Sequence, residues 1–398
     1  MAPQLSAKVI DLCPTCTHSE LSIALNHAHN KDTILITGGS YECKKLEIAK
    51  SITIIGRQRP HIVSADGDEI FVVTADSVRI IGLFLSGVVT NYLKENAAIR
   101  IRRSKHFELI GNTIQDCFFG IYLEHAKQGI LRNNSIEGAA TTELESGNAI
   151  HAWYCDSLIV EENYVSKHRD GIYLEFVNNS LIAKNTSKAN TRYGLHFMFS
   201  NDDKYLENTF TDNGVGVAVM FSSRIQMTYN EFSFNWGRSA YGLLLKEMND
   251  ANIAHNSFYQ NTIGIFVEGS NRINYTENTF SRNGWAIKFS GGCSANEITR
   301  NNFVQNSLDL IVGSSISDNR FHHNFWSSYT GYDLDKDQIG DVPHYPVKLF
   351  SYVLDQVPEA IVLMRSLFVD ILNFAEKVSP IFTPKEVLDP TPLMNRLP

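Results

Sequence analysis

A short motif of the form Asn-x-apolar recurs at a nearly constant interval through the middle of this 398-residue chain. Most copies are 22 or 23 residues apart, with two longer steps of 26 and 29 residues. The asparagines are Asn112, Asn134, Asn163, Asn208, Asn230, Asn256, Asn278 and Asn301, together with Asn185, which is in phase although its motif reads NTS. A fixed period of this length is typical of solenoids, in which each repeat stacks on its neighbours.

A second motif runs in phase with the first. It is a run of four or five strand-forming residues opened by Gly or Ala, such as GIYLE from Gly120, GLHFM from Gly194 and GIFVE from Gly264. Turn-forming Asn, β-type residues and the period together predict an all-β fold, a right-handed parallel β-helix with coils of about 22 residues. The LxxLxL spacing of leucine-rich repeats is missing. Because equivalent residues of stacked coils lie about 4.8 Å apart, the asparagines should form a ladder.

The chain changes character at both ends of the repeats. Residues 1–45 form a predicted N-terminal capping segment, in which LSIALNHAHN is expected to be a short helix that covers the edge of the first coil. The β-helix is predicted over 46–330, followed by an acidic loop and linker over 331–357. Residues 358–398 begin with PEAIVLMRSLFVDILNFAEKVSP, whose charges interrupt a membrane span. We expect an apolar amphipathic helix there, then an extended proline-rich tail.

The charge balance excludes one class of partner. The 35 basic and 43 acidic residues give a net charge of −8, which offers no concentrated basic surface for nucleic acid. The first ten residues, MAPQLSAKVI, have neither the charged start nor the apolar core of a secretory signal. Six cysteines do not make a disulfide framework in a chain of this length. Neither feature fixes the cellular compartment.

Aligning the coils places one column of Ile, Leu and Val inward and two columns outward. His196 and Met198, two positions apart, share the outward face, with Met220 expected directly above Met198 and with His151 nearby. Imidazole and thioether groups on one face suit a soft ion, above all Cu(I). The alternative is that these residues fill a groove under a loop or a partner, because Met is a common gap-filler.

The same face also resembles the polysaccharide-binding cleft of β-helix lyases and epimerases. HRDGIYLE, with Arg192 and Tyr193, supplies the residue types for a base and a charge-stabilising group. The alternative is an ion pair between Arg169 and Asp170 at a turn. We favour the ion pair, because other coils also present charged turns.

An acidic loop follows the last coil. GYDLDKDQIGDVP places carboxylates at positions 1, 3, 5 and 9, namely Asp333, Asp335, Asp337 and Asp341. Alternating carboxylates suit Ca²⁺, although Gln338 and His344 replace the Gly and Glu of an EF-hand at positions 6 and 12. The alternative is a solvated acidic turn.

A CxxC motif lies near the start, in DLCPTCTH. A single pair of cysteines, Cys13 and Cys16, is a poor zinc site, and no βαβ unit of the thioredoxin type surrounds it. A structural disulfide is the preferred interpretation, and a thiolate copper site involving these cysteines and His18 is the alternative.

Several segments, taken in order, resemble the NosD family of periplasmic accessory proteins for nitrous oxide reductase maturation. The segments are RDGIYLE, RYGLHFMFSNDD, GVGVAVMFS, YGLLLKE, NTIGIFVEGSNRI, NGWAIKFS, GYDLDKDQIGDVP and PEAIVLMRSLFVDIL. The resemblance extends over essentially the whole chain from about residue 20, although the CPTC sequence has no place in the family pattern. It implies a non-catalytic periplasmic β-helix that works with an ABC transporter, made of a permease and an ATPase, in copper assembly. Copper would come from a lipoprotein chaperone.

That resemblance also favours particular residues. His196, Met198, Met220 and His151 become the candidates for a transient Cu(I) site, because thioethers bind Cu(I) without deprotonation and release it readily. Residues 358–398 would dock on the permease, which would supply the protein's membrane contact. Two rival functions stay open: a carbohydrate-binding or carbohydrate-active β-helix, and a mechanical adaptor without a metal site.

Overall fold

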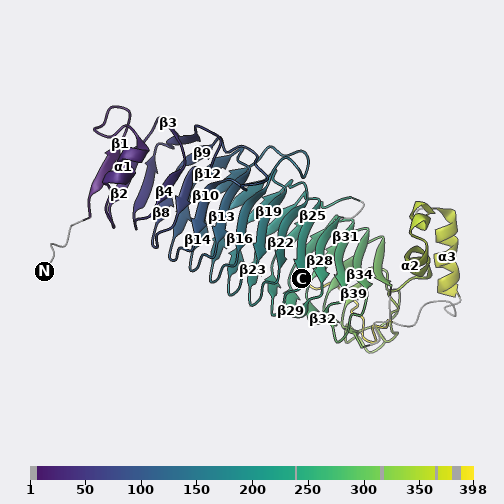
Figure 1. The fold of residues 1–398 in the computed structure, drawn as a ribbon. Helices are drawn as coiled ribbons and strands as arrows, with labels where there is room; N and C mark the ends of the chain where they lie inside the picture. Colours follow the sequence, from purple (N-terminus) through teal and green to yellow (C-terminus); the bar gives the residue numbers. More distant parts are fainter. Residues whose placement is uncertain (1–6, 238–239, 314–317, 364–365, 379–386) are drawn as a thin grey trace. The chain divides into compact units, whose positions relative to one another are not determined.

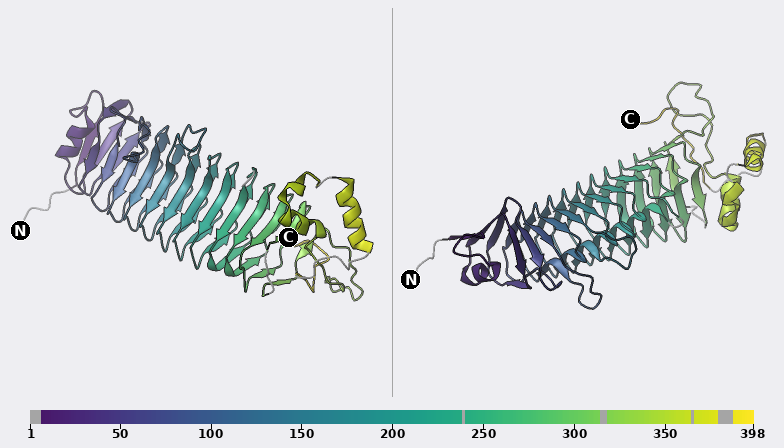
Figure 2. Two further views of the ribbon diagram at one scale, coloured as in Figure 1. Left: turned by 45° about the vertical axis from the view of Figure 1, so that its right-hand side comes forward. Right: turned by 90° about the horizontal axis from the view of Figure 1, so that it is seen from above.

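The computed structural model confirms the parallel β-solenoid. It describes residues 7–237, 240–313, 318–363, 366–378 and 387–398, and it divides into two compact units, Met1–Asn208 and Thr209–Pro398. Each unit is a stack of coils whose strands form three parallel sheets, A, B and C (Figures 1 and 2).

The strands of the first unit follow the chain order in each sheet. Sheet A contains β1 (Val9–Leu12), β2 (Thr33–Thr37), β5 (Thr53–Arg57), β8 (Arg79–Ile81), β11 (Glu108–Ile110), β14 (Ile130–Arg132), β17 (Ile159–Glu161), β20 (Leu181–Ala183) and β23 (Lys204–Leu206). Sheet B contains β3 (Ser40–Cys43), β6 (His61–Ser64), β9 (Phe84–Ser86), β12 (Thr113–Gln115), β15 (Ser135–Glu137), β18 (Tyr164–Ser166) and β21 (Thr186–Lys188). Sheet C contains β4 (Leu46–Ile48), β7 (Phe71–Val73), β10 (Ala97–Arg102), β13 (Phe119–Glu124), β16 (Asn148–Trp153), β19 (Asp170–Glu175) and β22 (Tyr193–Met198).

The second unit repeats the arrangement. Sheet A contains β26 (Gln226–Thr228), β29 (Asn249–Ala254), β32 (Asn271–Thr276), β35 (Glu297–Thr299) and β38 (Arg320–His322). Sheet B contains β24 (Thr209–Thr211), β27 (Glu231–Ser233), β30 (Ser257–Tyr259), β33 (Thr279–Ser281), β36 (Asn302–Val304) and β39 (Phe325–Trp326). Sheet C contains β25 (Val215–Met220), β28 (Tyr241–Lys246), β31 (Ile263–Glu268), β34 (Trp285–Ser290) and β37 (Leu308–Val312).

The inward column of sheet C forms the core of each unit, as predicted. In the first unit the column pairs Ile99, Ile121, Ile150, Ile172 and Leu195 from coil to coil, and in the second unit it pairs Val217, Leu243, Ile265 and Ile287. All of these side chains are fully buried. The register that also sets the outward columns is therefore correct within each unit.

The predicted asparagine ladder is present in both units. In the first unit, the backbone N–H and the Nδ2 group of each asparagine donate to Oδ1 of the next asparagine, from Asn112 to Asn208. Each Nδ2 also donates to a main-chain carbonyl, as from Asn163 to Leu131 at 2.9 Å. Because almost every polar atom of these buried amides is paired, the ladder holds the turns in register.

A second ladder was not predicted. In the second unit a ladder runs from Asn213 to Asn306 at the other end of sheet B. The backbone N–H of Asn213 donates to Oδ1 of Asn235, and both the backbone N–H and Nδ2 of Asn235, Asn261 and Asn283 donate to Oδ1 of the next asparagine. Each lies five residues after an asparagine of the first ladder, so this regular spacing is the signal that could have found it.

The N-terminal helix is confirmed as α1 (Leu21–His27), which packs beside β1 and β3. Its buried residues are Leu21, Ala24 and Leu25. The coils begin earlier than predicted, because β2 and β3, within the predicted capping segment 1–45, already pair with the coil strands β5 and β6. The cap is therefore shorter than that segment.

The C-terminal region is not the single helix predicted from Pro358. Helix α2 (Leu349–Gln356) ends before Pro358, a 3₁₀ helix η1 (Pro358–Leu363) follows, and α3 (Leu367–Val378) is separate. Proline has no N–H to donate and cannot continue a helix, which explains why α2, within the predicted linker 331–357, ends before Pro358. The departure from the predicted helix is that η1 and α3 are separate elements. Figure 1 shows α2 and α3 beyond β34 in the second unit, where α2 contacts β37. There Phe350, Leu354 and Val369 pack on Leu308 and Ile311.

The last residues, 387–398, are fastened to the final coil instead of forming a free extended tail. Asp389 is fully buried, and its Oδ2 accepts bonds from the Asn324 backbone N–H at 3.1 Å, from Asn324 Nδ2 at 3.1 Å and from Trp326 Nε1 at 2.9 Å. Asp389 thus closes the asparagine ladder where another coil would continue it. Residues 379–386 of the predicted tail lie outside the described residues.

Candidate metal site

The candidate site lies on the outer face of sheet C in the first unit. Strands β16, β19 and β22 pair so that His151 lies next to Tyr173 and Tyr173 next to His196. In the second outward column, Glu175 lies next to Met198. This is the predicted arrangement, but it places a tyrosine between the two histidines.

His196 is the unusual group of this face. Its side is the outer one, as predicted, yet the residue is only 7% exposed because the rings of Tyr173 and Tyr193 lie 5.0 and 4.6 Å from its own. Neither ring nitrogen has a hydrogen-bond partner among the described residues. Burial lowers the pKa of His196 to about 4. The imidazole is therefore neutral and keeps an unused lone pair, which is costly in the absence of a ligand.

Met198 lies on the same strand as His196, and its sulfur contacts the neighbouring coil. The hydroxyl of Tyr173 is 3.6 Å from Met198 Sδ and 3.3 Å from Glu175 Oε2. Burial, followed by the charge of Glu175, raises the pKa of Tyr173, so the phenol stays protonated and remains a donor. A thioether and a neutral imidazole thus occupy adjacent outward positions.

The other two predicted ligands are placed differently. His151 is 9% exposed, and its Nδ1 accepts a bond from Asn148 Nδ2 at 3.0 Å. Burial, then the charge of Arg169, lowers the pKa of His151 to about 3. Met220 belongs to the second unit, where it is half-buried on β25 and pairs with Lys246 of β28. A role for His151 and Met220 in metal binding stays a prediction.

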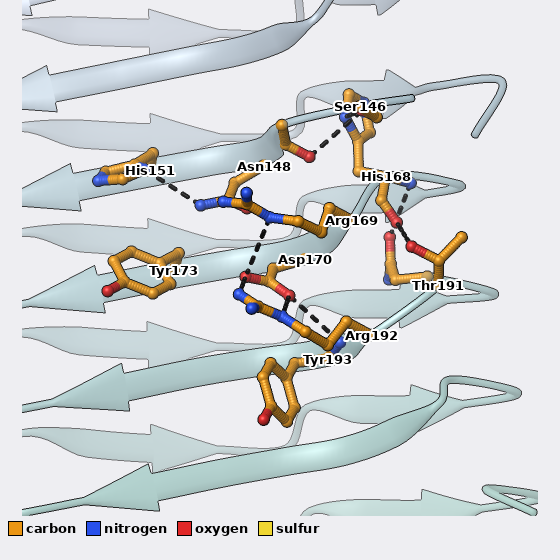
Figure 3. Close-up of polar contacts among 12 residues, drawn as sticks. Ser146, Asn148, His151, His168, Arg169, Asp170, Tyr173, Thr191, Arg192 and Tyr193 are labelled. Carbon is orange, nitrogen blue, oxygen red and sulfur yellow. Dashed lines mark hydrogen bonds and ion pairs between the residues drawn. The ribbon is translucent and has the colours of Figure 1, made fainter. Parts of the chain in front are cut away.

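A polar cluster lies at the start of strands β16, β19 and β22 (Figure 3). Asp170 is fully buried, and Arg192 binds both of its oxygens, Nε to Oδ1 at 2.9 Å and Nη2 to Oδ2 at 2.5 Å. Arg169 Nε lies 3.9 Å from Asp170 Oδ2, and Arg169 Nη2 donates to Asn148 Oδ1 at 3.2 Å. The predicted ion pair is confirmed, with Arg192 as the stronger partner that sequence reasoning missed.

The acidic loop brings three of its four predicted carboxylates together. Oxygens of Asp333, Asp335 and Asp337 lie within 4.8 Å of one another. They also accept backbone N–H groups of the loop itself, as Asp333 does from Gln338 at 3.0 Å, and Asp341 accepts from Leu334 at 2.7 Å. These hydrogen bonds account for the conformation of the loop without a bound ion, and calcium binding stays a prediction.

The CxxC motif forms a disulfide. Cys13 and Cys16 are bonded, with their Cα atoms 5.0 Å apart, which confirms the preferred interpretation. A thiolate copper site would require reduction of this bond first. The remaining cysteines, Cys43, Cys117, Cys155 and Cys293, are buried thiols.

Comparison with known proteins agrees with the resemblance in the sequence. Residues 132–331, half of the chain, match the family described as periplasmic copper-binding protein (NosD). The chain belongs to the NosD family. Two curated relatives are each named probable ABC transporter binding protein NosD: one from Stutzerimonas stutzeri, 29% identical over 114 residues, and one from Pseudomonas aeruginosa, 28% identical over 114 residues. Each match covers 27% of this chain and 26% of the relative, so it spans about a quarter of either length.

Solved structures share the NosD fold without close sequence similarity. A PL6 alginate lyase in complex with a trisaccharide matches with a TM-score of 0.59 and 12% identity, over 80% of this chain and 85% of that one. An aspartate-to-alanine mutant of the periplasmic alginate epimerase AlgG matches with a TM-score of 0.53 and 12% identity, over 74% of this chain and 76% of that one. At this identity the likeness concerns the β-solenoid alone. Among the described residues, the helices are all too short or too polar to cross a bilayer.

Proposed function

We propose that this chain is a non-catalytic NosD protein of the periplasm that receives Cu(I) at His196 and Met198 and passes it on during copper assembly in nitrous oxide reductase. The observation that carries the proposal is the buried imidazole of His196, whose two nitrogens have no partner among the described residues, two positions before Met198 on the same strand. The copper-binding description of the family supports the choice of metal. A lipoprotein chaperone would be the donor and the reductase the acceptor.

The two donors suit transfer more than storage. Cu(I) prefers soft ligands, and neither a thioether nor a neutral imidazole must lose a proton to bind it. Because burial holds the pKa of His196 at about 4, copper would not compete with a proton at neutral pH. Two neutral donors bind the ion weakly enough to exchange it with a partner's ligands.

The cluster beside His196 supports a binding role over a carbohydrate-active one. A lyase or epimerase needs a base that is free to take a proton from the substrate. Asp170 is fully buried and held by Arg192 through two bonds. His168, the histidine of HRDGIYLE, is fully buried and its Nδ1 is bonded to the Ser146 hydroxyl at 2.9 Å. The carboxylate and the histidine that sequence reasoning offered as a base are thus held away from a substrate.

Copper affinity tests the proposal directly. Anaerobic titration of Cu(I) against a competing chelator should give one site in the wild type. The double variant His196→Ala with Met198→Ala should bind Cu(I) at least about 100-fold more weakly. Removing a residue that only orients a metal ligand already lowers metal affinity by up to about 100-fold. The matched control is His255→Ala, a half-exposed histidine of the second unit paired with Glu277, which should leave affinity unchanged.

Two other results would reject this site. Equal binding by the wild type and the double variant would place copper elsewhere, with Cys13 and Cys16 as the next candidates after reduction. Absence of binding by the wild type would favour the mechanical adaptor.

The outer face of α3 supports docking on the permease of an ABC transporter. Its exposed residues Leu367, Phe368, Ile371 and Phe374 lie on one side, while Val369 packs on the solenoid end. An exposed apolar face of this kind marks a contact surface, and the relatives' name indicates an ABC transporter as the partner.

Substitutions on α3 test that contact. Phe368→Ser combined with Ile371→Ser should reduce copurification of the permease with this chain at least about tenfold, since these rings and methyls would be the buried anchors. The thermal midpoint should be unchanged, because both side chains are exposed. Copurification at the wild-type level would show that α3 is not the contact.

A further inference from the structure

Two consecutive histidines lie at the last strand of sheet A in the second unit. His322 ends β38, and His323 follows it with a left-handed backbone, at φ 55°. Successive residues of a strand point to opposite faces, but this turn brings the two rings together. Their Nδ1 atoms are 3.0 Å apart, and the ring planes are inclined at 84°. Both residues are only half-buried, so an ion can reach them from solvent.

The neighbouring strand β35 fixes the orientation of His322. Glu297 Oε1 accepts a bond from His322 Nε2 at 2.8 Å, and the hydroxyl of Thr299 lies 3.2 Å from His322 Nδ1. Arg320, the register partner of Glu297, makes no ion pair with it in the described part of the chain. Because an ionised carboxylate only accepts hydrogen bonds, the proton of neutral His322 lies on Nε2 and its Nδ1 keeps a lone pair.

A carboxylate on one ring nitrogen and a lone pair on the other is the usual arrangement of a histidine that binds a metal. In the metal-free chain this lone pair of His322 accepts the Nδ1–H of His323. Two nitrogens bound about 2.0–2.1 Å from one tetrahedral ion lie roughly 3.3 Å apart, so an ion can replace that proton after a small movement of the rings. His323 loses the proton on Nδ1 and takes one up on Nε2, so no proton is released overall.

We propose that His322 Nδ1 and His323 Nδ1 bind one divalent ion of the Zn²⁺ and Cu²⁺ class, with Glu297 as the residue that positions His322. Imidazole nitrogens suit these ions, whereas Ca²⁺ and Mg²⁺ prefer oxygen ligands. The remaining coordination positions are left to water. The site belongs to the second unit and does not depend on the proposed Cu(I) site at His196 and Met198.

Electron paramagnetic resonance of the full chain with one equivalent of Cu²⁺ tests the site. The spectrum should show hyperfine splitting from two nitrogen ligands. Titration against a competing chelator should give one bound ion, with a higher affinity for Cu²⁺ than for Zn²⁺. An excess of Ca²⁺ should leave the spectrum unchanged.

His323→Ala is the decisive variant, because it removes one of the two ligands. Cu²⁺ affinity should fall at least about tenfold, since loss of a residue that only orients a ligand already costs about 10–100-fold, and the spectrum should keep a single nitrogen. The matched control is His255→Ala, a histidine of the same unit that pairs with Glu277 at 3.2 Å, which should retain the affinity and the two-nitrogen spectrum.

The bound ion should also stabilise the fold. The backbone N–H of His323 donates to the carbonyl of Thr391 at 3.1 Å, so an ion at the histidine pair holds the turn to which residues 387–398 are fastened. Zn²⁺ should therefore raise the thermal midpoint of the wild type and leave that of His323→Ala unchanged. Without metal the circular dichroism of the two proteins should be the same.

Substitution of Glu297 tests its positioning role. Glu297→Ala should weaken Cu²⁺ binding about tenfold or more. Glu297→Gln, whose amide oxygen can still accept the Nε2–H of His322, should recover part of the affinity. Nitrogen NMR of the metal-free imidazoles should show the Nε2–H form of His322 in the wild type and a mixture of both forms in Glu297→Ala, which a merely structural role would not produce.

Three results would overturn the site. One is equal Cu²⁺ affinity in the wild type and His323→Ala. Another is displacement of Cu²⁺ by Ca²⁺, which would assign the ion to the loop of Asp333, Asp335 and Asp337. The third is loss of Cu²⁺ binding in the His196→Ala, Met198→Ala double variant, which would assign the ion to the first unit. Retention in that variant would support the histidine pair, whether or not the Cu(I) site is correct.

Discussion

Replacing Asn163 with alanine is expected to lower the free energy of unfolding by about 3–5 kcal/mol, because it leaves several buried polar groups without partners. Oδ1 of Asn163 accepts bonds from the backbone N–H and Nδ2 of Asn134 at 3.0 and 2.9 Å. Its own Nδ2 donates to the carbonyl of Leu131 and to Oδ1 of Asn185 at 2.9 and 3.0 Å. Alanine removes all four bonds from a site that is 1% exposed, where water cannot replace them.

Urea denaturation followed by circular dichroism measures this loss. Asn30→Ala is the control, because Asn30 is exposed and its Oδ1 accepts a single bond, from the Ser51 N–H at 3.0 Å. The control should cost less than about 1 kcal/mol. A similar small cost for Asn163→Ala would mean that the ladder contributes little and that apolar stacking alone holds the coils in register.

Asp203→Asn should give the second large effect, a gain in stability at high pH on the order of 2–5 kcal/mol. Burial raises the pKa of Asp203 from 3.8 to about 8, although its oxygens accept bonds from the Ser180 N–H at 2.7 Å and from the Tyr205 hydroxyl at 3.4 Å. The nearby charges of Asp202 and Asp156 raise it further. The folded chain therefore keeps a proton that the unfolded chain has lost.

The sign of the pH dependence follows from that difference. Between pH 3.8 and about 8 the folded state binds more protons at Asp203, so stability falls as pH rises through this window and is lowest above it. Unfolding curves at pH 5, 7 and 9 should show the wild type weakening and Asp203→Asn weakening less. The exposed Asp76→Asn variant should follow the wild type, and parallel curves for the wild type and Asp203→Asn would refute the raised pKa.

Much of the fold was encoded in short-range spacing. In a solenoid each coil contacts the coils before and after it, so a residue and its structural neighbour are separated by one period of the sequence. That is why the inward column from Ile99, the ladder from Asn112 and the outward positions of His196 and Met198 followed from alignment alone. The family also followed from the order of these segments.

The environment of each side chain depended on tertiary contacts instead. Alignment gave the side of the sheet for His196, but only the packing of the Tyr173 and Tyr193 rings decided that it is buried and unpaired. The sequence suggested Arg169 as the partner of Asp170, and the geometry of adjacent coils gave that role mainly to Arg192. The rotamer and the burial of a side chain depend on its neighbours in the folded protein, and the spacing of residues in the sequence does not contain this information.

By itself, then, the sequence determined the β-solenoid, its register and the side of the sheet on which His196 and Met198 lie. These features depend on a residue pattern that occurs again in every coil. Only the tertiary structure decided the helix α2 ahead of Pro358, the division of the predicted C-terminal helix into η1 and α3, and the return of residues 387–398 to the last coil. Asp389 and Asn324 are 65 positions apart and belong to no repeat. The contact forms because the buried N–H groups of Asn324, at the end of the ladder, need a hydrogen-bond acceptor, and the Asp389 carboxylate provides it.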